Sequence, residues 1–290
     1  MKGRSAASRR IGFGGFGGFG GSSLIVIGVV LLGLSIVGPR TPLAQYDNRD
    51  ARPWESFDPA LAQRARTPAA LAAEARVLLP SFDRATDRQR MDALYDVVAA
   101  RFTHSNGARH TLGTNWLLFL AGQVVRPFGL IWDPAVYLAS GHSLVCSQSS
   151  YLLLQLALDE GIPARHVGLI GHVVMEAWYD GDWHLYDPDT EATPVQANGD
   201  IPSVEELALD RDLLERAYTG ENAQYVDIIA SRENNTYMSY PVGTHFTWQA
   251  EVLALIERVA QVLKYVLPLL LIGAGAWWTV RTAGRRSDDA

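Results

Sequence analysis

The chain has 290 residues, of which 48% are hydrophobic and 19% are charged, and its formal net charge is −6. This much apolar sequence excludes a mainly disordered chain, and the acidic excess excludes a general nucleic-acid binder, because a surface that follows phosphates must be basic. The charged fraction lies below the roughly 25% of a typical soluble domain, so part of the apolar sequence is expected outside any water-facing fold.

The N-terminal region is basic and then strongly apolar. Residues 1–44 hold five bases and no acid, and four of these bases precede the apolar run. A signal peptidase site needs small residues, but the best candidate, 42–44, begins with a proline. A retained transmembrane signal anchor over 22–38 is therefore favoured over a cleaved signal, with a Gly-rich basic cytoplasmic tail over 1–21.

A second apolar run covers 259–280, close to the ~20 residues that cross a bilayer. Its one base, Lys264, is expected to snorkel to an interface, and three arginines follow within 281–290. The alternative is a buried C-terminal helix of a soluble domain. With basic residues at both ends, the positive-inside rule predicts cytoplasmic tails and an extracytoplasmic domain over 45–258, anchored in the inner (plasma) membrane.

The chain has one cysteine, Cys146, so an intramolecular disulfide is impossible. Most free cysteines are small buried hydrophobes, which is the alternative to a reactive thiol. The polar segment 143–150 precedes the apolar run 151–158, and Gly161 and Pro163 follow. This pattern predicts a buried helix with Cys146 in or just before its first turn, where the helix dipole favours a thiolate and the free N–H groups can receive an oxyanion.

A β region follows this helix. Segments 165–170, 172–179 and 183–187 read as strands, and Asp180-Gly181 is a strong signal for a two-residue hairpin turn.

The hairpin turn fixes the register of the last two strands. Pairing across the turn places Val174 opposite Asp187 and Glu176 opposite Leu185. His172 then lies diagonal to Asp187 on the same face, roughly 7–8 Å away at Cα. The pattern thus brings a histidine and a carboxylate together, and Glu176 on that face either assists them or is structural.

Helices are expected on both sides of this region. Residues 85–104 predict an upstream helix, a capping box at 203–206 opens a helix to about Tyr218, and 249–257 run helically into the second anchor.

A thiol at a helix N-terminus and a histidine oriented by an aspartate are the parts needed for nucleophilic acyl transfer. The features in chain order are Cys146 opening a helix, Gly161-Ile-Pro-Ala-Arg165 before a strand, His172 with Glu176 and Trp178, Asp180-Gly181, Trp183, and Asp187-Pro188. Together they resemble the transglutaminase-like superfamily of papain-like cysteine enzymes, over about 85–195.

The resemblance implies an α+β fold with a papain-like/transglutaminase-like core, in which the Cys-bearing buried helix packs on an antiparallel sheet. It implies thioester formation by Cys146 on a carboxamide or peptide carbonyl, followed by hydrolysis or transfer to an amine. His172 would be the general base and then acid, and Asp187 would fix its tautomer.

Some positions depart from the family pattern. Leu144 stands where the family often has glycine, and Val173 and Val174 replace its usual small and aromatic residues. These changes affect the expected substrate cleft more than the triad. The second oxyanion donor of the family corresponds to either Gln123 or Trp132.

No cofactor and no metal are expected, because the seven histidines show no ligand spacing on one helix face. The expected partners are a peptide or protein amide substrate, the lipid membrane through two helices, and envelope or polysaccharide-export components; nucleic acid is not expected. The competing hypothesis is a catalytically silent scaffold or binding module in an envelope complex.

Overall fold

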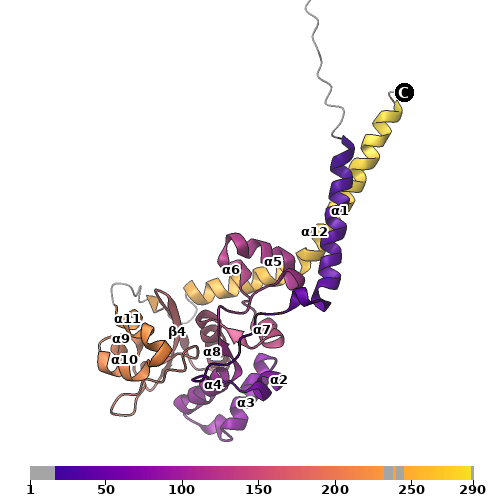
Figure 1. Cartoon of the computed structure of the whole chain (residues 1–290). Helices are drawn as coiled ribbons and strands as arrows, with labels where there is room; N and C mark the ends of the chain where they lie inside the picture. The colour runs from indigo at the N-terminus through magenta and orange to yellow at the C-terminus, as the bar shows by residue number, and fades with distance from the viewer. Residues whose placement is uncertain (1–16, 232–237, 240–244, 289–290) are drawn as a thin grey trace, which may run out of the picture. The chain divides into compact units, whose positions relative to one another are not determined.

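The computed structural model describes residues 17–231, 238–239 and 245–288, and it has an α+β architecture (Figure 1). It divides into two compact units. The first comprises Met1–Ala44, Leu112–Leu117 and Ala260–Ala290, and the second comprises Gln45–Thr111 and Leu118–Val259. Most of the predicted N-terminal tail, residues 1–16, lies outside the described residues.

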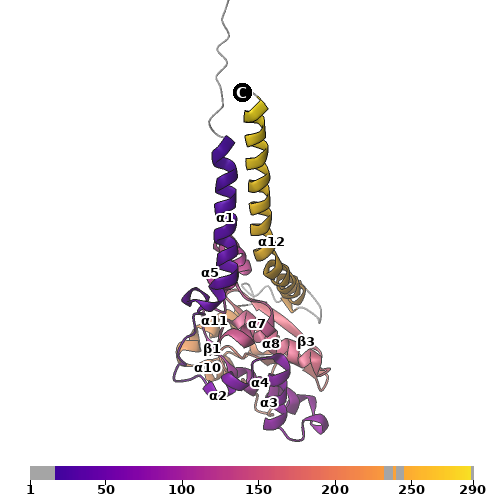
Figure 2. The same cartoon turned by 90° about the vertical axis from the view of Figure 1, so that its right-hand side faces the viewer.

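Two long apolar helices dominate the first unit: α1 (Gly17–Val37) and the C-terminal part of α12 (His245–Asp288). Both are long and apolar enough to cross a membrane, over Gly20–Arg40 and Ala250–Gly284. They lie side by side in Figure 2, and glycines permit the close approach. A Cβ added to Gly28 would come within 2.7 Å of a carbonyl oxygen in α12, and one on Gly275 within 2.5 Å of one in α1.

Lys264 does not extend toward an interface as expected. It is 6% exposed, and its Nζ donates to the carbonyl oxygen of Thr114 at 2.8 Å. Its own carbonyl accepts a hydrogen bond from Ser35 Oγ at 2.7 Å. The lysine therefore joins α1, α12 and the 112–117 segment through hydrogen bonds, which satisfies its polar groups among apolar helices.

The second unit contains a four-stranded antiparallel sheet in the order β5-β4-β3-β6. Its strands are β3 (Ala164–Leu169), β4 (His172–Tyr179), β5 (Asp182–Tyr186) and β6 (Met238–Ser239). The predicted hairpin register is confirmed, because Glu176 pairs with Leu185. Asp180 and Gly181 have φ of +51° and +91°, as a two-residue turn of type I′ requires. The short strand β6 was not predicted.

Helix α8 (Cys146–Asp159) packs on this sheet and supplies much of the core, as Figure 1 shows for α8 and β4. The predicted upstream helix is α4 (Asp87–Arg101), whose N-terminus is closed by a Thr86–Gln89 capping box. A small parallel sheet of β1 (Thr103–His104) and β2 (Ser143–Leu144) leads the chain into α8.

The helix predicted from the capping box at 203–206 to about Tyr218 is two helices, so that prediction was wrong in its extent. Ser203 does cap α9, but Asp210 accepts a hydrogen bond from the backbone N–H of Leu213 at 2.9 Å and starts a new helix. An aspartate cap competes with continuation of the preceding helix.

The remaining helices surround the sheet or precede α8. They are α2 (Pro59–Arg64), α3 (Pro68–Leu78), α5 (Leu112–Val124), α6 (Arg126–Gly129), α7 (Pro134–Ser140), α9 (Val204–Leu207), α10 (Arg211–Ala217) and α11 (Gln224–Ala230), with 3-10 turns η1 (Gly38–Arg40), η2 (Pro42–Ala44), η3 (Phe82–Arg84) and η4 (Gly220–Ala223).

Candidate active site

Cys146 is the first residue of α8, and its side chain is partly exposed. Strand β2 ends at Leu144, and Val145 is extended (φ −108°, ψ 159°), so the chain enters the helix directly from the strand. Backbone N–H groups in the first turn of a helix have no intrahelical acceptor. The thiol therefore lies where partial positive charge is concentrated, as the sequence predicted.

Gln148 holds this helix start in place. Its Nε2 donates to the carbonyl oxygens of Ile131 and Ala108 at 2.6 and 2.9 Å, and its Oε1 accepts from the N–H of Ala108 at 2.9 Å. Gln148 is fully buried. One turn along, Ser150 Oγ donates to the carbonyl oxygen of Val173 at 3.0 Å, which ties α8 to the start of β4.

His172 and Asp187 are brought together by the β4–β5 hairpin. His172 opens β4, and Asp187 directly follows β5. His172 Nε2 lies 2.8 Å from Asp187 Oδ2, and both side chains have zero exposure. The diagonal placement predicted from the turn therefore becomes a direct hydrogen bond.

The charges of this pair are coupled. Burial alone would lower the pKa of His172, but the Asp187 carboxylate and the Cys146 side chain outweigh it and raise the pKa well above the usual 6.5. Burial alone would raise the pKa of Asp187, but His172 and the hydrogen bonds from Thr190 and Tyr218 hold it below the usual 3.8. The site thus favours an imidazolium beside a carboxylate.

Aromatic side chains enclose the pair. Tyr218 Oη donates to Asp187 Oδ2 at 3.1 Å, and the ring of Tyr225 lies 4.2 Å from that of His172, centroid to centroid. Tyr95 Oη donates at 3.3 Å to the backbone carbonyl of Asp187. Asp187 is therefore held by hydrogen bonds at both its carboxylate and its backbone carbonyl.

Asp189 is a further carboxylate at the same place. Three possible ligand atoms, one each from Cys146, His172 and Asp189, lie within 4.8 Å of one another. Asp189 Oδ2 lies 2.7 Å from Nδ1 of His104, which comes from β1. Burial raises the pKa of Asp189 above its usual 3.8, although His104 opposes the shift.

Several residues around the pair were not assigned from the sequence, among them Asp189, His104, Tyr218 and Tyr225. The signal available for Asp189 was its position two residues after Asp187 in a turn. His104 reaches the site because β1 pairs in parallel with β2, a long-range contact without a local pattern.

Neither predicted oxyanion donor is supported. The Gln123 side chain is exposed and donates to the carbonyl oxygen of Phe119 in its own helix at 3.2 Å. The Trp132 indole donates to the carbonyl oxygen of Pro127 at 2.8 Å. Among the described residues, both side-chain N–H donors are thus engaged by backbone carbonyls and not by Cys146.

Glu176 has a structural role. Its Oε2 lies 2.6 Å from Arg165 Nε, and its Oε1 accepts from the N–H of Val204 at 2.7 Å, at the start of α9. The carboxylate therefore joins β4 to β3 and α9, and its parity with His172 does not bring it into the site.

In comparisons with known proteins, no family model, no curated protein and no solved structure matches the chain.

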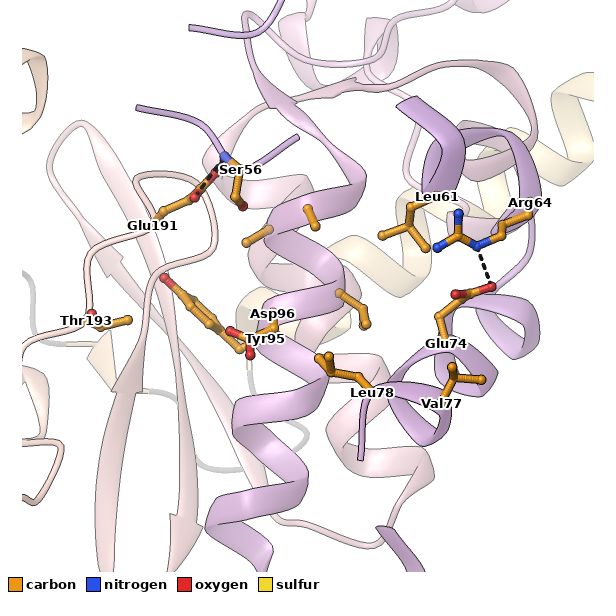
Figure 3. Close-up of a pocket in the computed structure, with 13 residues that line it drawn as sticks. Ser56, Leu61, Arg64, Glu74, Val77, Leu78, Tyr95, Asp96, Glu191 and Thr193 are labelled. Atoms are coloured by element: carbon orange, nitrogen blue, oxygen red, sulfur yellow. Dashed lines mark hydrogen bonds and ion pairs between the residues drawn. The ribbon is translucent and has the colours of Figure 1, made fainter. Parts of the chain in front are cut away.

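A cavity of about 680 Å³ is lined by residues of α2, α3 and α4 and by Glu191 and Thr193 (Figure 3). Tyr95 and Asp96 of α4 border it together with Glu191, whose carboxylate accepts the N–H of Ser56. Cys146 does not line this cavity. Its volume suits a small ligand, but His172 and Asp187 do not line it either.

Replacing Tyr218 with phenylalanine should lower the free energy of unfolding by about 1.5–3 kcal/mol, the range for a hydrogen bond to a charged group. Denaturant unfolding followed by tryptophan fluorescence measures the change. Tyr225→Phe is the matched control, because it keeps the ring that lies against His172. Equal losses in the two variants would show that the Tyr218–Asp187 bond contributes nothing specific.

Proposed function

We propose that this protein is a membrane-anchored cysteine acyl-transfer enzyme, an amide or peptide hydrolase or a transglutaminase-type enzyme, with a papain-like/transglutaminase-like core. The observation that carries the proposal is the chain of side chains from Cys146 at the start of α8, through His172, to the buried Asp187. Nucleophilic catalysis needs a nucleophile, a base within reach and a group that orients the base, and these three residues supply them.

The first half of the reaction forms a thioester. The Cys146 thiolate attacks the carbonyl carbon of an amide, and the carbonyl electron pair moves onto oxygen, where first-turn N–H groups of α8 stabilise it. The imidazolium of His172 then gives its Nδ1 proton to the amide nitrogen. The C–N bond breaks, and ammonia or an amine leaves.

The second half regenerates the thiol. Neutral His172 accepts a proton from water or from an amine as that molecule attacks the thioester carbonyl. The C–S bond breaks, an acid or a new amide is released, and the thiolate–imidazolium pair is restored. Asp187, held by Tyr218, keeps Nε2 protonated so that Nδ1 faces the reaction throughout.

Hydrolysis is the expected outcome. Lysine occurs only at positions 2 and 264, so the domain itself offers no lysine amine as an acceptor. With glutamine peptides as substrate, wild-type protein should release ammonia faster than it incorporates an added lysine amine, and Cys146→Ala should do neither. Faster amine incorporation would reverse the order of the two activities. Equal ammonia release by Cys146→Ala would remove Cys146 from the reaction.

The two apolar helices support placing the proposed enzyme in the inner (plasma) membrane with its domain outside the cytoplasm. Reporter fusions should locate residues 20 and 288 in the cytoplasm and residue 150 outside it. A cytoplasmic signal at residue 150 would contradict this orientation. Envelope or polysaccharide-export components are the partners that such a location suggests.

A further inference from the structure

We propose that Cys146, His172 and Asp189 form a binding site for a zinc ion, and that zinc bound there blocks the thiol. The inhibitory consequence rests on the proposed function. The binding site itself rests on the three donor atoms, which lie within 4.8 Å of one another.

The donor set is one that zinc prefers. Thiolate sulfur, imidazole nitrogen and carboxylate oxygen all bind zinc, at about 2.0–2.3 Å in tetrahedral geometry. Those bond lengths require donor atoms roughly 3.3–3.7 Å apart. The three donors would therefore close by about 1 Å, a change that side-chain torsions alone can provide.

His172 is oriented as a metal-bound histidine is. Its Nε2 is engaged by Asp187 at 2.8 Å, which leaves Nδ1 for Cys146 or a metal. A carboxylate on the far nitrogen of a ligand histidine fixes its tautomer and strengthens its donor atom. The same Asp187 that serves the proposed catalysis thus also supports metal binding.

Two buried donor atoms face the place of the ion. Among the described residues, His172 Nδ1 has no hydrogen bond of good geometry, and Asp189 Oδ2 has only its close contact with His104. His172 is 1% exposed and Asp189 is 5% exposed. A buried polar atom without a well-formed hydrogen bond is costly, and a zinc ion would give His172 Nδ1 a partner and Asp189 a second one. His104, with Nδ1 2.7 Å from Asp189 Oδ2, would then support the bound carboxylate from outside.

The side of the site at Cys146 is open, because Cys146 is partly exposed. An ion can enter there, and a water molecule can complete a four-ligand shell. Binding replaces the proton that Cys146 and His172 share, which passes to solvent. No electron transfer is involved. A sulfur bound to zinc in this way cannot attack a carbonyl or an alkylating reagent.

The test uses the full chain in detergent micelles, with zinc alone as the ligand. Iodoacetamide alkylation of Cys146 is followed by mass spectrometry at increasing zinc concentration. When one equivalent of zinc is bound to the protein, alkylation of Cys146 should be at least tenfold slower. Each alkylation rate is divided by the metal-free rate of the same variant. Asp189→Asn should raise at least tenfold the zinc concentration that halves this normalised rate. Asp212→Asn, an exposed aspartate in α10, is the matched control and should behave as wild type.

A second measurement does not depend on how the variants fold. Cobalt(II) added to wild-type protein should give a thiolate-to-metal charge-transfer band at one equivalent, and prior alkylation of Cys146 should abolish it. Absence of that band, or equal zinc protection of wild type and Asp189→Asn, would overturn the site. If zinc protects Cys146 but the wild-type protein releases no ammonia from glutamine peptides, only the proposed enzymatic function is contradicted.

Discussion

Replacing His172 with alanine should slow iodoacetamide alkylation of folded Cys146 at about pH 6 by roughly 10- to 100-fold. At that pH a free cysteine, with a pKa of about 8.5, is under about 1% ionised. The raised pKa of His172 keeps an imidazolium beside Cys146 at this pH, and a neighbouring cation makes a thiol more reactive. Without His172, the Cys146 thiol loses this neighbouring positive charge.

His142→Ala is the matched control for this experiment. The His142 ring stacks on Phe57 at 4.8 Å between centroids and belongs to neither the pair nor its surroundings. Its removal should leave the alkylation rate unchanged. If Cys146 is instead a buried structural residue of a scaffold, wild-type alkylation will be slow until the domain unfolds, and neither variant will change it.

Asp187→Asn should lower the free energy of unfolding by about 3–5 kcal/mol, as removal of one partner from a buried ion pair does. Its side chain is fully buried and contacts His172 and Tyr218. Asparagine has nearly the same shape but no charge. The loss therefore reports the carboxylate and its partners, with little contribution from packing.

The pH dependence of this loss follows from the two pKa shifts. The pKa of Asp187 is lowered from 3.8, so its contribution is present above pH 3.8 and is lost as pH falls through the lower folded value. The pKa of His172 is raised from 6.5, so its contribution is complete below pH 6.5 and is lost as pH rises through the higher folded value.

The difference in unfolding free energy between wild type and Asp187→Asn should therefore be largest between about pH 4 and 6.5 and should decline at alkaline pH. Denaturant titrations at about pH 5.5 and at about pH 9.5 measure it. A difference that does not change with pH would show that the pair is not ionised.

Local sequence signals predicted the central part of the site. The Asp180-Gly181 turn fixes the register of β4 and β5, and that register places Asp187 diagonal to His172. The start of α8 at Cys146 followed from the change from polar to apolar residues.

Long-range contacts were beyond these signals. His104 enters the site through the two-residue parallel pairing of Thr103 with Ser143, and such a short strand has no periodicity to detect. Gln148 holds Ala108 and Ile131 beside the start of α8, and this contact between distant segments leaves no local signal in the sequence. For this reason the sequence left Gln123 and Trp132 as alternatives, and the structure favours neither.

The most direct test of the account is mass spectrometry of the full-length protein after exposure to envelope extract. We expect an acyl adduct on Cys146 that hydroxylamine removes, because a thioester is the intermediate that the Cys146, His172 and Asp187 arrangement would form. The adduct should be absent from Cys146→Ser. An unmodified Cys146 in the wild-type protein, with the adduct absent under every condition in which the domain stays folded, would contradict the enzymatic account and favour the scaffold.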